Sequence, residues 1–266
     1  MIFNVFDYGA KGDGRTNDAA AIQKAIDECS DKGGTVLLPG GYTFRSGSIV
    51  LKSNTELHLE NGAVLKASDD MEDFNLFSEA RQDAGLDVPT YENCDYEGRP
   101  KLFFLYACSA DNVRITGSGT IDGNEEIYYG KITKWHIDGS FYPRMPLFYL
   151  EDIHNLTIKD VTLTHSAFWT VHMIGCRDVL IDGIRIYNNT RLANSDGIDP
   201  DHCQNVRIAN CFIEGADDCI VFKNTESAKK YGPCQNITVS NCILSSTSAA
   251  VKFGSESTML FRNIVV

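Results

Sequence analysis

The sequence lacks a surplus of positive charge: 24 lysines and arginines stand against 36 aspartates and glutamates, a formal net charge of −12. Nucleic acids and anionic membranes attract positive charge, so neither is an expected partner. No apolar stretch approaches about 18 residues, which predicts no transmembrane helix. Only 7 prolines accompany 22 glycines, which indicates tight turns without proline-rich linkers. Hydrophobic residues make up 43% of the 266, and this excludes an intrinsically disordered chain.

The cysteines include no C-x-x-C pair, which argues against a zinc site. There are nine, so a full set of bridges would leave one thiol over. We expect mostly small buried hydrophobes, with a bridge such as Cys219 to Cys234 as the alternative. The N-terminus shows no basic region followed by an apolar run. As it stands the sequence predicts a cytoplasmic protein; if a leader was removed, the protein would be secreted or periplasmic.

One helix is predicted near the N-terminus. Thr16 or Asn17 is expected to cap it, with Asp18 in its first turn. Gly33 and Gly34 are expected to end it. Between them an apolar stripe has helical spacing: Ala21, Ile22, Ala25, Ile26 and Cys29. Helical periodicity then almost disappears, and β-rich runs punctuated by glycine or asparagine follow at 35–38, 48–51, 56–59 and 63–65.

A short phrase recurs along the rest of the chain: asparagine or aspartate followed by three residues of β type. It begins at Asn112, Asn155, Asp178, Asn205, Asn236 and Asn263. The last five positions are 23, 27, 31 and 27 residues apart, a variable period typical of a solenoid of stacked β-coils. In a parallel β-helix each coil lies about 4.8 Å from the next, so equivalent residues form ladders. Cys211 and Cys242 are expected to be neighbours in one such ladder.

The predicted fold is all-β, a single parallel β-helix domain over residues 1–266, and its N-terminal cap at about 1–34 includes the helix. The chain stops within a repeat, so we expect a β-helix truncated at its C-terminus. Two insertions rich in aromatic residues interrupt the repeat at about 68–100 and 124–146, and these are expected to be loops on one face. Their aromatic pairs either stack on sugar rings or pack on one another: residues 128–129, 135–136 and 141–142.

Three aspartates form the most informative group. Asp196 precedes Asp217 and Asp218 by 21 and 22 residues, which is close to one coil. If Ile198 stacks beneath Ile220, the three carboxylates gather in one patch. Carboxylates that close raise at least one pKa. Glycosidic cleavage needs one acid to protonate the leaving oxygen and another carboxylate to activate water. The alternative is that these aspartates only mark turns on an acidic surface.

Five segments carry a family resemblance. Residues 6–14 read Phe-Asp-Tyr-Gly-Ala-Lys-Gly-Asp-Gly, residues 34–41 read Gly-Thr-Val-Leu-Leu-Pro-Gly-Gly, and residues 117–123 read Gly-Ser-Gly-Thr-Ile-Asp-Gly. Residues 194–199 read Asn-Ser-Asp-Gly-Ile-Asp, and residues 215–220 read Gly-Ala-Asp-Asp-Cys-Ile. Over nearly the whole chain the sequence resembles glycoside hydrolase family 28, the polygalacturonase and rhamnogalacturonan hydrolase family, which has Asn-Thr-Asp-Gly-x-Asp and Gly-Asp-Asp-Cys-type motifs at the last two places.

The resemblance implies a right-handed parallel β-helix and hydrolysis with inversion, without metal or cofactor. By analogy Asp217 is the general acid, and Asp196 and Asp218 position and activate the water. Inversion predicts roughly 6.5 to 9.5 Å between the acid and base carboxyl groups, which leaves room for that water.

Two departures from the family pattern concern the substrate site. Where the family usually has Gly-His-Gly, this chain has Ser-Thr-Ser-Ala-Ala at 246–250, and repeat alignment sets Ser248 against Asp217. A serine can form hydrogen bonds but cannot tune the acid as a histidine would. The Arg-x-Lys substrate-binding motif of the family is expected one coil later, beyond residue 266, so this chain is expected to lack part of the site and to be of uncertain activity.

Five residues are candidates for substrate binding: Asn194, Ser248, Lys223, Lys252 and His202. Repeat alignment sets Asp201 beside Lys223, and Lys252 near Val221 one coil on. Either lysine could bind a uronate carboxylate, and the alternative is an ordinary surface ion pair worth under about 1 kcal/mol. His202 is expected to be a structural or rim histidine rather than a catalyst. His165 and His172 are expected to be exposed and have no interpretable spacing.

Three functions compete on this reading. The first is a glycosidase that cleaves galacturonide or related α-linkages in pectic poly- or oligosaccharides. The second is a β-helix polysaccharide lyase, which needs a lysine or arginine base and usually Ca²⁺ near acidic residues. The third is a non-catalytic carbohydrate-binding β-helix. An unsaturated product that absorbs ultraviolet light would select the lyase.

Overall fold

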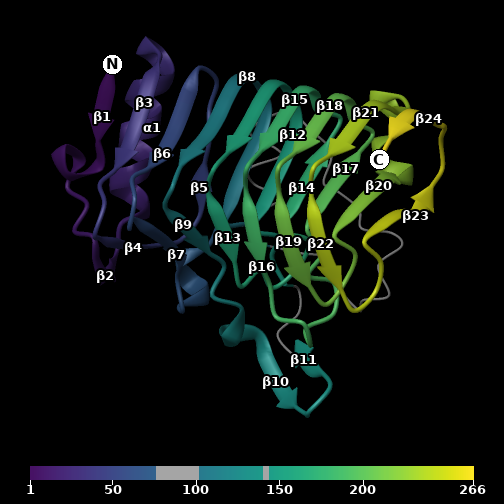
Figure 1. Cartoon of the computed structure of the whole chain (residues 1–266). Coiled ribbons are helices and arrows are strands. Elements are labelled where there is room, and N and C mark those ends of the chain that lie inside the picture. Colours follow the sequence, from purple (N-terminus) through teal and green to yellow (C-terminus); the bar gives the residue numbers. More distant parts are fainter. Residues whose placement is uncertain (76–101, 140–143) are drawn as a thin grey trace.

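The computed structural model describes residues 1–75, 102–139 and 144–266, which form one stack of β-coils (Figure 1). Each coil contributes strands to three faces, and on these faces every strand pairs in parallel with its equivalent one coil away. This is the predicted parallel β-helix. Among the described residues no helix is long and apolar enough to cross a membrane.

The first face of the β-helix consists of β1 (Ile2–Asn4), β3 (Gly34–Leu38), β6 (Thr55–Leu59), β8 (Leu105–Gly117), β12 (Phe148–Lys159), β15 (Arg177–Asp182), β18 (Gln204–Ala209), β21 (Cys234–Ser240) and β24 (Phe261–Val265). The second face contains β5 (Ile49–Val50), β14 (Val171–Ile174), β17 (Ile198–Asp201), β20 (Ile220–Asn224) and β23 (Val251–Ser257). The long strands β8 and β12 belong to both faces, because their first residues pair with β5 or β14 and their last residues pair with β6 or β15.

The third face of the β-helix consists of β2 (Asp13–Asn17), β4 (Thr43–Ser46), β7 (Val64–Ala67), β9 (Thr120–Asp122), β13 (Thr162–Thr164), β16 (Arg185–Tyr187), β19 (Phe212–Gly215) and β22 (Ile243–Ser246). Side chains alternate along the strands, as in β6, where Thr55, Leu57 and Leu59 are buried. The inward rows of the three faces form one continuous apolar core along the stack.

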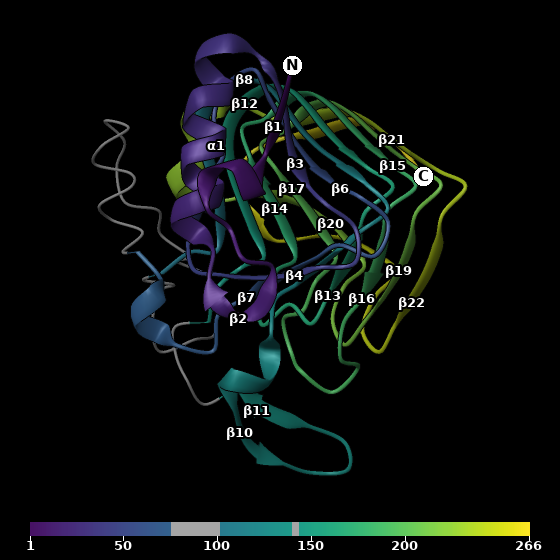
Figure 2. The same ribbon diagram turned by 90° about the vertical axis from the view of Figure 1, so that its left-hand side faces the viewer.

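The N-terminal helix α1 (Ala19–Lys32) covers the first coils (Figures 1 and 2). The predicted stripe is confirmed: Ile22, Ala25, Ile26 and Cys29 are fully buried. The predicted start is one residue early, because Asp18 is the N-cap residue rather than part of the first turn. Its carboxylate instead accepts hydrogen bonds from the N–H groups of Lys11 and Gly12, at 2.7 and 3.0 Å, and so ties the preceding loop to the helix. Gly33 ends the helix as predicted.

The recurring asparagines form a ladder along the bend between the second and first faces. Every anchor adopts a left-handed backbone conformation, with φ between 53 and 62°. Each amide donates a hydrogen bond to the side chain one coil earlier; Asn205, for example, donates to Asp178 at 3.0 Å and accepts from Asn236 at 3.1 Å. Asparagine and aspartate tolerate this conformation better than other side chains, which explains why the phrase recurs.

Replacement of Asn205 tests the ladder. We expect Asn205→Ala to lower the free energy of unfolding by about 1–2 kcal/mol, because it strains the left-handed backbone and removes two hydrogen bonds. Asn205→Gly keeps the backbone relaxed and should lose less. Urea denaturation of the three proteins measures the difference. An alanine variant as stable as the parent, or a glycine variant less stable than alanine, would contradict this account.

The structure describes the second of the two predicted insertions more fully than the first. The insertion at 124–146 contains the 3₁₀ helix η3 (Glu125–Tyr128) and an antiparallel hairpin, β10 (Tyr129–Ile132) and β11 (Ile137–Gly139), rather than loop alone. The 3₁₀ helices η1 (Val5–Tyr8), η2 (Met71–Asp73) and η4 (Glu226–Tyr231) complete the described elements. Most of the insertion at 68–100, and the pair at 141–142, lie outside the described residues.

The cysteines of the described segments are free thiols, and most are buried, as expected. The alternative bridge between Cys219 and Cys234 is therefore wrong. The two side chains contribute to the apolar core instead. Cys211 and Cys242 are neighbours in adjacent coils, as predicted, since each directly precedes paired residues of β19 and β22.

Candidate active site

The three predicted carboxylates meet where the chain turns from the third face into the second. Asp196 lies between β16 and β17, and Asp217 and Asp218 lie one coil later between β19 and β20. Ile198 pairs with Ile220, which confirms the predicted register. One oxygen of each carboxylate lies within 4.8 Å of the other two. The cluster is therefore real, and its nearest oxygens are closer than the separation of roughly 6.5 to 9.5 Å predicted for an inverting pair.

Gly197 allows the two coils to approach at the cluster. A Cβ atom at this position would lie 2.4 Å from the carbonyl oxygen of Cys219, so a larger residue would push the coils apart. The Gly197 N–H also donates to the carbonyl oxygen of Asp218 at 3.0 Å. The Asp-Gly pair thus does more than mark a turn, because it holds Asp196 against Asp218.

Asp218 is buried and held in one orientation by three donors. Its Oδ1 accepts from the Ser248 hydroxyl at 2.9 Å and the Ala249 N–H at 3.1 Å, and its Oδ2 accepts from Lys252 Nζ at 2.8 Å. Ser248 therefore contacts Asp218, whereas the repeat alignment had set it against Asp217.

Asp217 is the partly exposed member of the cluster. Its Oδ2 accepts from the Asn194 N–H and its Oδ1 from the Asp218 N–H, both at 3.0 Å. These bonds orient the carboxyl group from behind and leave its outer side open. The side-chain oxygen of Asn194 accepts from Arg144 at 3.3 Å, so Asn194 contributes its backbone to the cluster.

Asp196 is 3% exposed, and its Oδ1 has no hydrogen-bond partner among the described residues. Burial raises the pKa of this carboxyl to about 8, and the neighbouring Asp217 and Asp218 add to the rise, whereas Lys223 opposes it. The cluster therefore retains a proton near neutral pH. The raised pKa that the sequence predicted for at least one of the crowded carboxyls is therefore that of Asp196.

The raised pKa makes stability depend on pH. The carboxyl of Asp196 has a pKa of about 8 in the folded protein and about 3.9 when unfolded, so its ionisation destabilises the fold as pH rises from 4 through 8. Asp196→Asn removes this loss. We expect its gain in melting temperature over the parent to grow across that range and to level off above it. Parallel melts at pH 4, 6, 8 and 9 measure the gain, and a gain that does not change with pH would contradict the prediction.

Lys223 is not at the surface, contrary to both alternatives of the sequence analysis. It pairs with Asp201 in register, as predicted, but it is 3% exposed. Its Nζ lies 3.0 Å from Glu256 Oε2 and 3.8 Å from Asp199 Oδ1. Trp169 covers it, with Nζ 4.0 Å from the ring centroid. A lysine so enclosed acts on the cluster through its field and does not reach a substrate carboxylate.

Asp199 and Glu256 had no predicted role. Asp199 is fully buried, and neither carboxylate oxygen has a hydrogen-bond partner within the described segments. Burial raises the pKa of Asp199 well above its usual range, and the charge of Asp196 adds to the rise. Alternation along the strands could have placed Asp199 and Lys223 on the outward side of the second face. No sequence spacing shows that Trp169 covers that side.

The histidines are structural or remote from the cluster. His202 is fully buried; its Nε2 lies 2.8 Å from the carbonyl oxygen of Thr225, and its Nδ1 contacts the carbonyl oxygen of Gly232. Because His202 is fully buried, its prediction as a substrate-binding residue is corrected. His172 is 1% exposed, so its predicted exposure is wrong; it lies beneath Tyr149 and Trp169 with Nε2 3.5 Å from Asp201. His165 is exposed as predicted and pairs with Asp122 at 3.0 Å.

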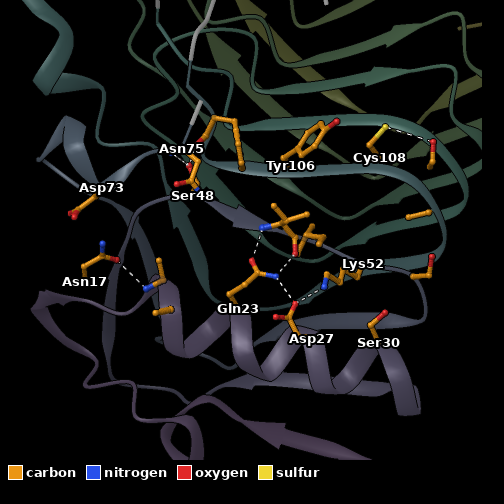
Figure 3. A pocket seen from close by; sticks show the side chains of 18 residues that line it. Asn17, Gln23, Asp27, Ser30, Ser48, Lys52, Asp73, Asn75, Tyr106 and Cys108 are labelled. Carbon is orange, nitrogen blue, oxygen red and sulfur yellow. Dashed lines mark hydrogen bonds and ion pairs between the residues drawn. The ribbon is translucent and has the colours of Figure 1, made fainter. Parts of the chain in front are cut away.

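A cavity of about 1020 Å³ lies away from the carboxylate cluster, between α1 and the start of the second face (Figure 3). Gln23 crosses its floor and bonds both backbone groups of Val50, at 2.8 and 3.0 Å. The Gln23 amide so completes the hydrogen bonding of the β5 edge. Both lining carboxylates are engaged: Asp27 pairs with Lys52 at 2.8 Å, and Asp73 pairs with Arg45 at 3.0 Å. The described residues that line this cavity therefore offer no free carboxyl pair for acid–base catalysis.

The sequence matches two protein families and is similar to curated relatives. The sequence profile of glycosyl hydrolases family 28 matches residues 58–258, and that of rhamnogalacturonase A/epimerase, pectate lyase-like, matches residues 2–95. The chain is 32% identical over 226 residues to "Probable polygalacturonase" of Vitis vinifera, covering 83% of this chain and 44% of the relative. It is 29% identical over 263 residues to "Exo-poly-alpha-D-galacturonosidase" of Dickeya chrysanthemi, covering 83% of this chain and 42% of the relative.

A solved structure supports the fold directly. The hyperthermoactive exopolygalacturonase of Thermotoga maritima superposes with a TM-score of 0.74 at 26% identity, covering 99% of this chain and 65% of that one. The fold places the chain in the class of right-handed parallel β-helix proteins. Within that class the chain belongs to glycosyl hydrolases family 28. It spans less than half the length of the curated relatives just named.

Proposed function

We propose that this chain carries the acid–base centre of a glycoside hydrolase that cleaves galacturonide or related α-glycosidic bonds in pectic poly- or oligosaccharides with inversion. The observation that supports it most is the cluster of Asp196, Asp217 and Asp218, in which a buried acid of raised pKa adjoins a carboxyl group held in place by three donors. The relatives named as polygalacturonases support the substrate class.

In this proposal Asp217 is the general acid, because it is the member whose outer side is open to a substrate. It protonates the leaving glycosidic oxygen as the bond to the anomeric carbon breaks. Asp196 and Asp218 orient a water on the opposite face of the sugar, and Asp218 takes its proton as it attacks. The proton that the cluster retains near neutral pH serves the next turnover, since strongly interacting carboxyls share it.

Lys252 is the candidate contact for a uronate carboxylate. Its side chain is 40% exposed, and its ammonium group lies 2.8 Å from Asp218. Its remaining N–H donors can bind the carboxylate of a uronate. Its positive charge would also reduce the repulsion between the acidic cluster and an anionic sugar. Burial excludes Lys223 and His202 from this role.

Incubation of the chain with polygalacturonate and with defined oligogalacturonides tests the proposal. New reducing ends, with an inverted anomeric configuration in the first product seen by proton NMR, are expected. An ultraviolet-absorbing unsaturated product would select the lyase instead. Binding without cleavage would select the non-catalytic β-helix.

A further inference from the structure

The hairpin β10–β11 stands apart from the coil architecture. It is an antiparallel pair, unlike the strands of the three faces, and it projects from the stack between the turns of the third and second faces (Figures 1 and 2). Its tip carries Trp135, of which 78% is exposed. Water surrounds this large ring at a cost in free energy, so its exposure calls for a physical reason.

The turn that carries Trp135 is ordered by its own hydrogen bonds. The Thr133 hydroxyl accepts from the N–H groups of Trp135 and His136, at 3.3 and 2.9 Å. The Thr133 N–H donates to the carbonyl oxygen of His136 at 2.8 Å. Lys134 lies beside the ring, with Nζ 4.4 Å from its centroid. The turn therefore presents an aromatic face and an ammonium group together.

The hairpin is braced against the loop that leads to the carboxylate cluster. Ile137 bridges to Leu192, and its N–H donates to the carbonyl oxygen of Arg191 at 2.9 Å. Arg191 returns a bond from Nη1 to the carbonyl oxygen of Thr133 at 3.0 Å. The same loop continues to Asn194, whose N–H orients Asp217. The hairpin and the carboxylate cluster are therefore joined by a short, hydrogen-bonded segment.

Local charge at the hairpin opposes the charge of the whole chain. Lys131 and Lys134 are exposed on it, and Arg191 supports it, whereas the hairpin itself contributes one exposed carboxylate, Asp138. The chain as a whole carries a formal charge of −12. A cationic edge on such a protein attracts an anionic ligand locally.

We propose that the tip of this hairpin is an auxiliary binding site for an anionic polysaccharide chain, in which Trp135 stacks on a sugar ring and Lys134 and Lys131 face uronate carboxylates. The site deepens the proposed function and rests on it for the identity of the polymer. The ring offers a flat apolar face for the C–H side of a sugar, and the ammonium groups supply the charge recognition. A polysaccharide that binds at the hairpin and at the carboxylate cluster together gains affinity, because binding at one place raises the effective concentration at the other. A disaccharide that binds at one place only does not gain in this way.

Tryptophan fluorescence tests the site without any need for catalysis. The chain has two tryptophans, and Trp169 is 4% exposed, so acrylamide quenches mainly Trp135. Polygalacturonate should protect Trp135 from acrylamide in the Asp217→Asn variant, which cannot consume the polymer in our proposal. Neutral dextran and monomeric galacturonate should not. Trp135→Phe should abolish the protected signal while the Trp169 emission remains.

Affinity for polygalacturonate provides the second readout. We expect about tenfold weaker binding for Trp135→Ala, and a smaller loss with a shallower salt dependence for Lys134→Gln. Ile132→Ala, which truncates another exposed apolar side chain of the same hairpin, is the matched control and should bind as the parent does. Unchanged affinity in Trp135→Ala, or equal loss in Ile132→Ala, overturns the site.

The outcomes separate this inference from the proposed function. Protection of Trp135 by polygalacturonate in a protein that releases no reducing ends would sustain the binding site and refute the hydrolase. Hydrolysis with no protection of Trp135 would do the reverse. Protection that instead follows protein concentration without polymer would assign the hairpin to self-association and refute the polysaccharide site.

Discussion

Asp217→Asn is expected to lower kcat/KM on polygalacturonate by about 10²–10⁴-fold, the usual contribution of a positioned general acid. The amide keeps the shape of the side chain, and its one oxygen can still accept a hydrogen bond from either the Asn194 or the Asp218 N–H group. It cannot donate a proton to the leaving oxygen. Removal of one of three crowded carboxylates should leave stability unchanged or slightly higher, so the loss is not one of folding.

Initial rates of reducing-end release measure this effect, with urea denaturation run on the same samples. Asp31→Asn is the matched control, because it makes the same chemical change at an exposed position on α1 and should retain the parental rate. A loss of less than tenfold in Asp217→Asn would remove Asp217 from the acid role. A comparable loss in Asp31→Asn would show that the assay reports net charge.

Lys223→Met is expected to lower the free energy of unfolding by about 3–5 kcal/mol near pH 8, the usual effect of removing one partner from a buried ion pair. Glu256 loses its 3.0 Å partner, and Asp199 and Asp196 lose the positive charge of Lys223, which opposes the effect of their burial. Methionine fills a similar volume and packs against Trp169, so loss of packing contributes little.

The pH dependence distinguishes lost charge from lost packing. Without Lys223, the pKa values of Asp196 and Asp199 rise further in the folded protein. A raised carboxyl stabilises the fold fully below its unfolded pKa of about 4 and loses that contribution as pH rises. The deficit of Lys223→Met should therefore grow between pH 4 and pH 8.

Urea titrations at pH 4, 6 and 8 measure this deficit, and Lys223→Met/Glu256→Gln should recover part of it at pH 8. The other titratable groups that face Lys223 and its carboxylate partners are not mutated in these variants: Asp201, Asp217, Asp218, His172 and Lys252. A deficit that is equal at all three pH values would assign Lys223 a packing role.

Much of this architecture follows from local rules that the sequence displays. The asparagine phrase predicts the coils because each anchor must adopt a left-handed turn and bond to its neighbour, which few side chains can do. The spacing from Asp196 to Asp217 and Asp218 predicts their meeting, because successive coils repeat the same path. The start of α1 was misplaced by one residue, because Asp18 serves a loop as well as the helix end.

The surroundings of the cluster could not be predicted in the same way. Lys223 and His172 are predicted at the surface from their residue types, because lysine is rarely fully buried and histidine is often partly exposed. On the second face a small separate core covers them instead, built from aromatic side chains of distant segments such as Tyr149, Trp169 and Tyr231. Contacts between segments this far apart leave no periodic trace in the sequence.

The sequence by itself determined the coil, its register and the membership of the carboxylate cluster, since these arise from short repeats and from the fixed spacing between coils. The tertiary structure decided which carboxyl holds a proton and which lysine beside the cluster stays accessible. Asp196 keeps its proton because burial removes water from it, and Lys252 stays partly exposed whereas Trp169 encloses Lys223. Desolvation depends on everything that packs around a group, and only the folded chain brings those neighbours together.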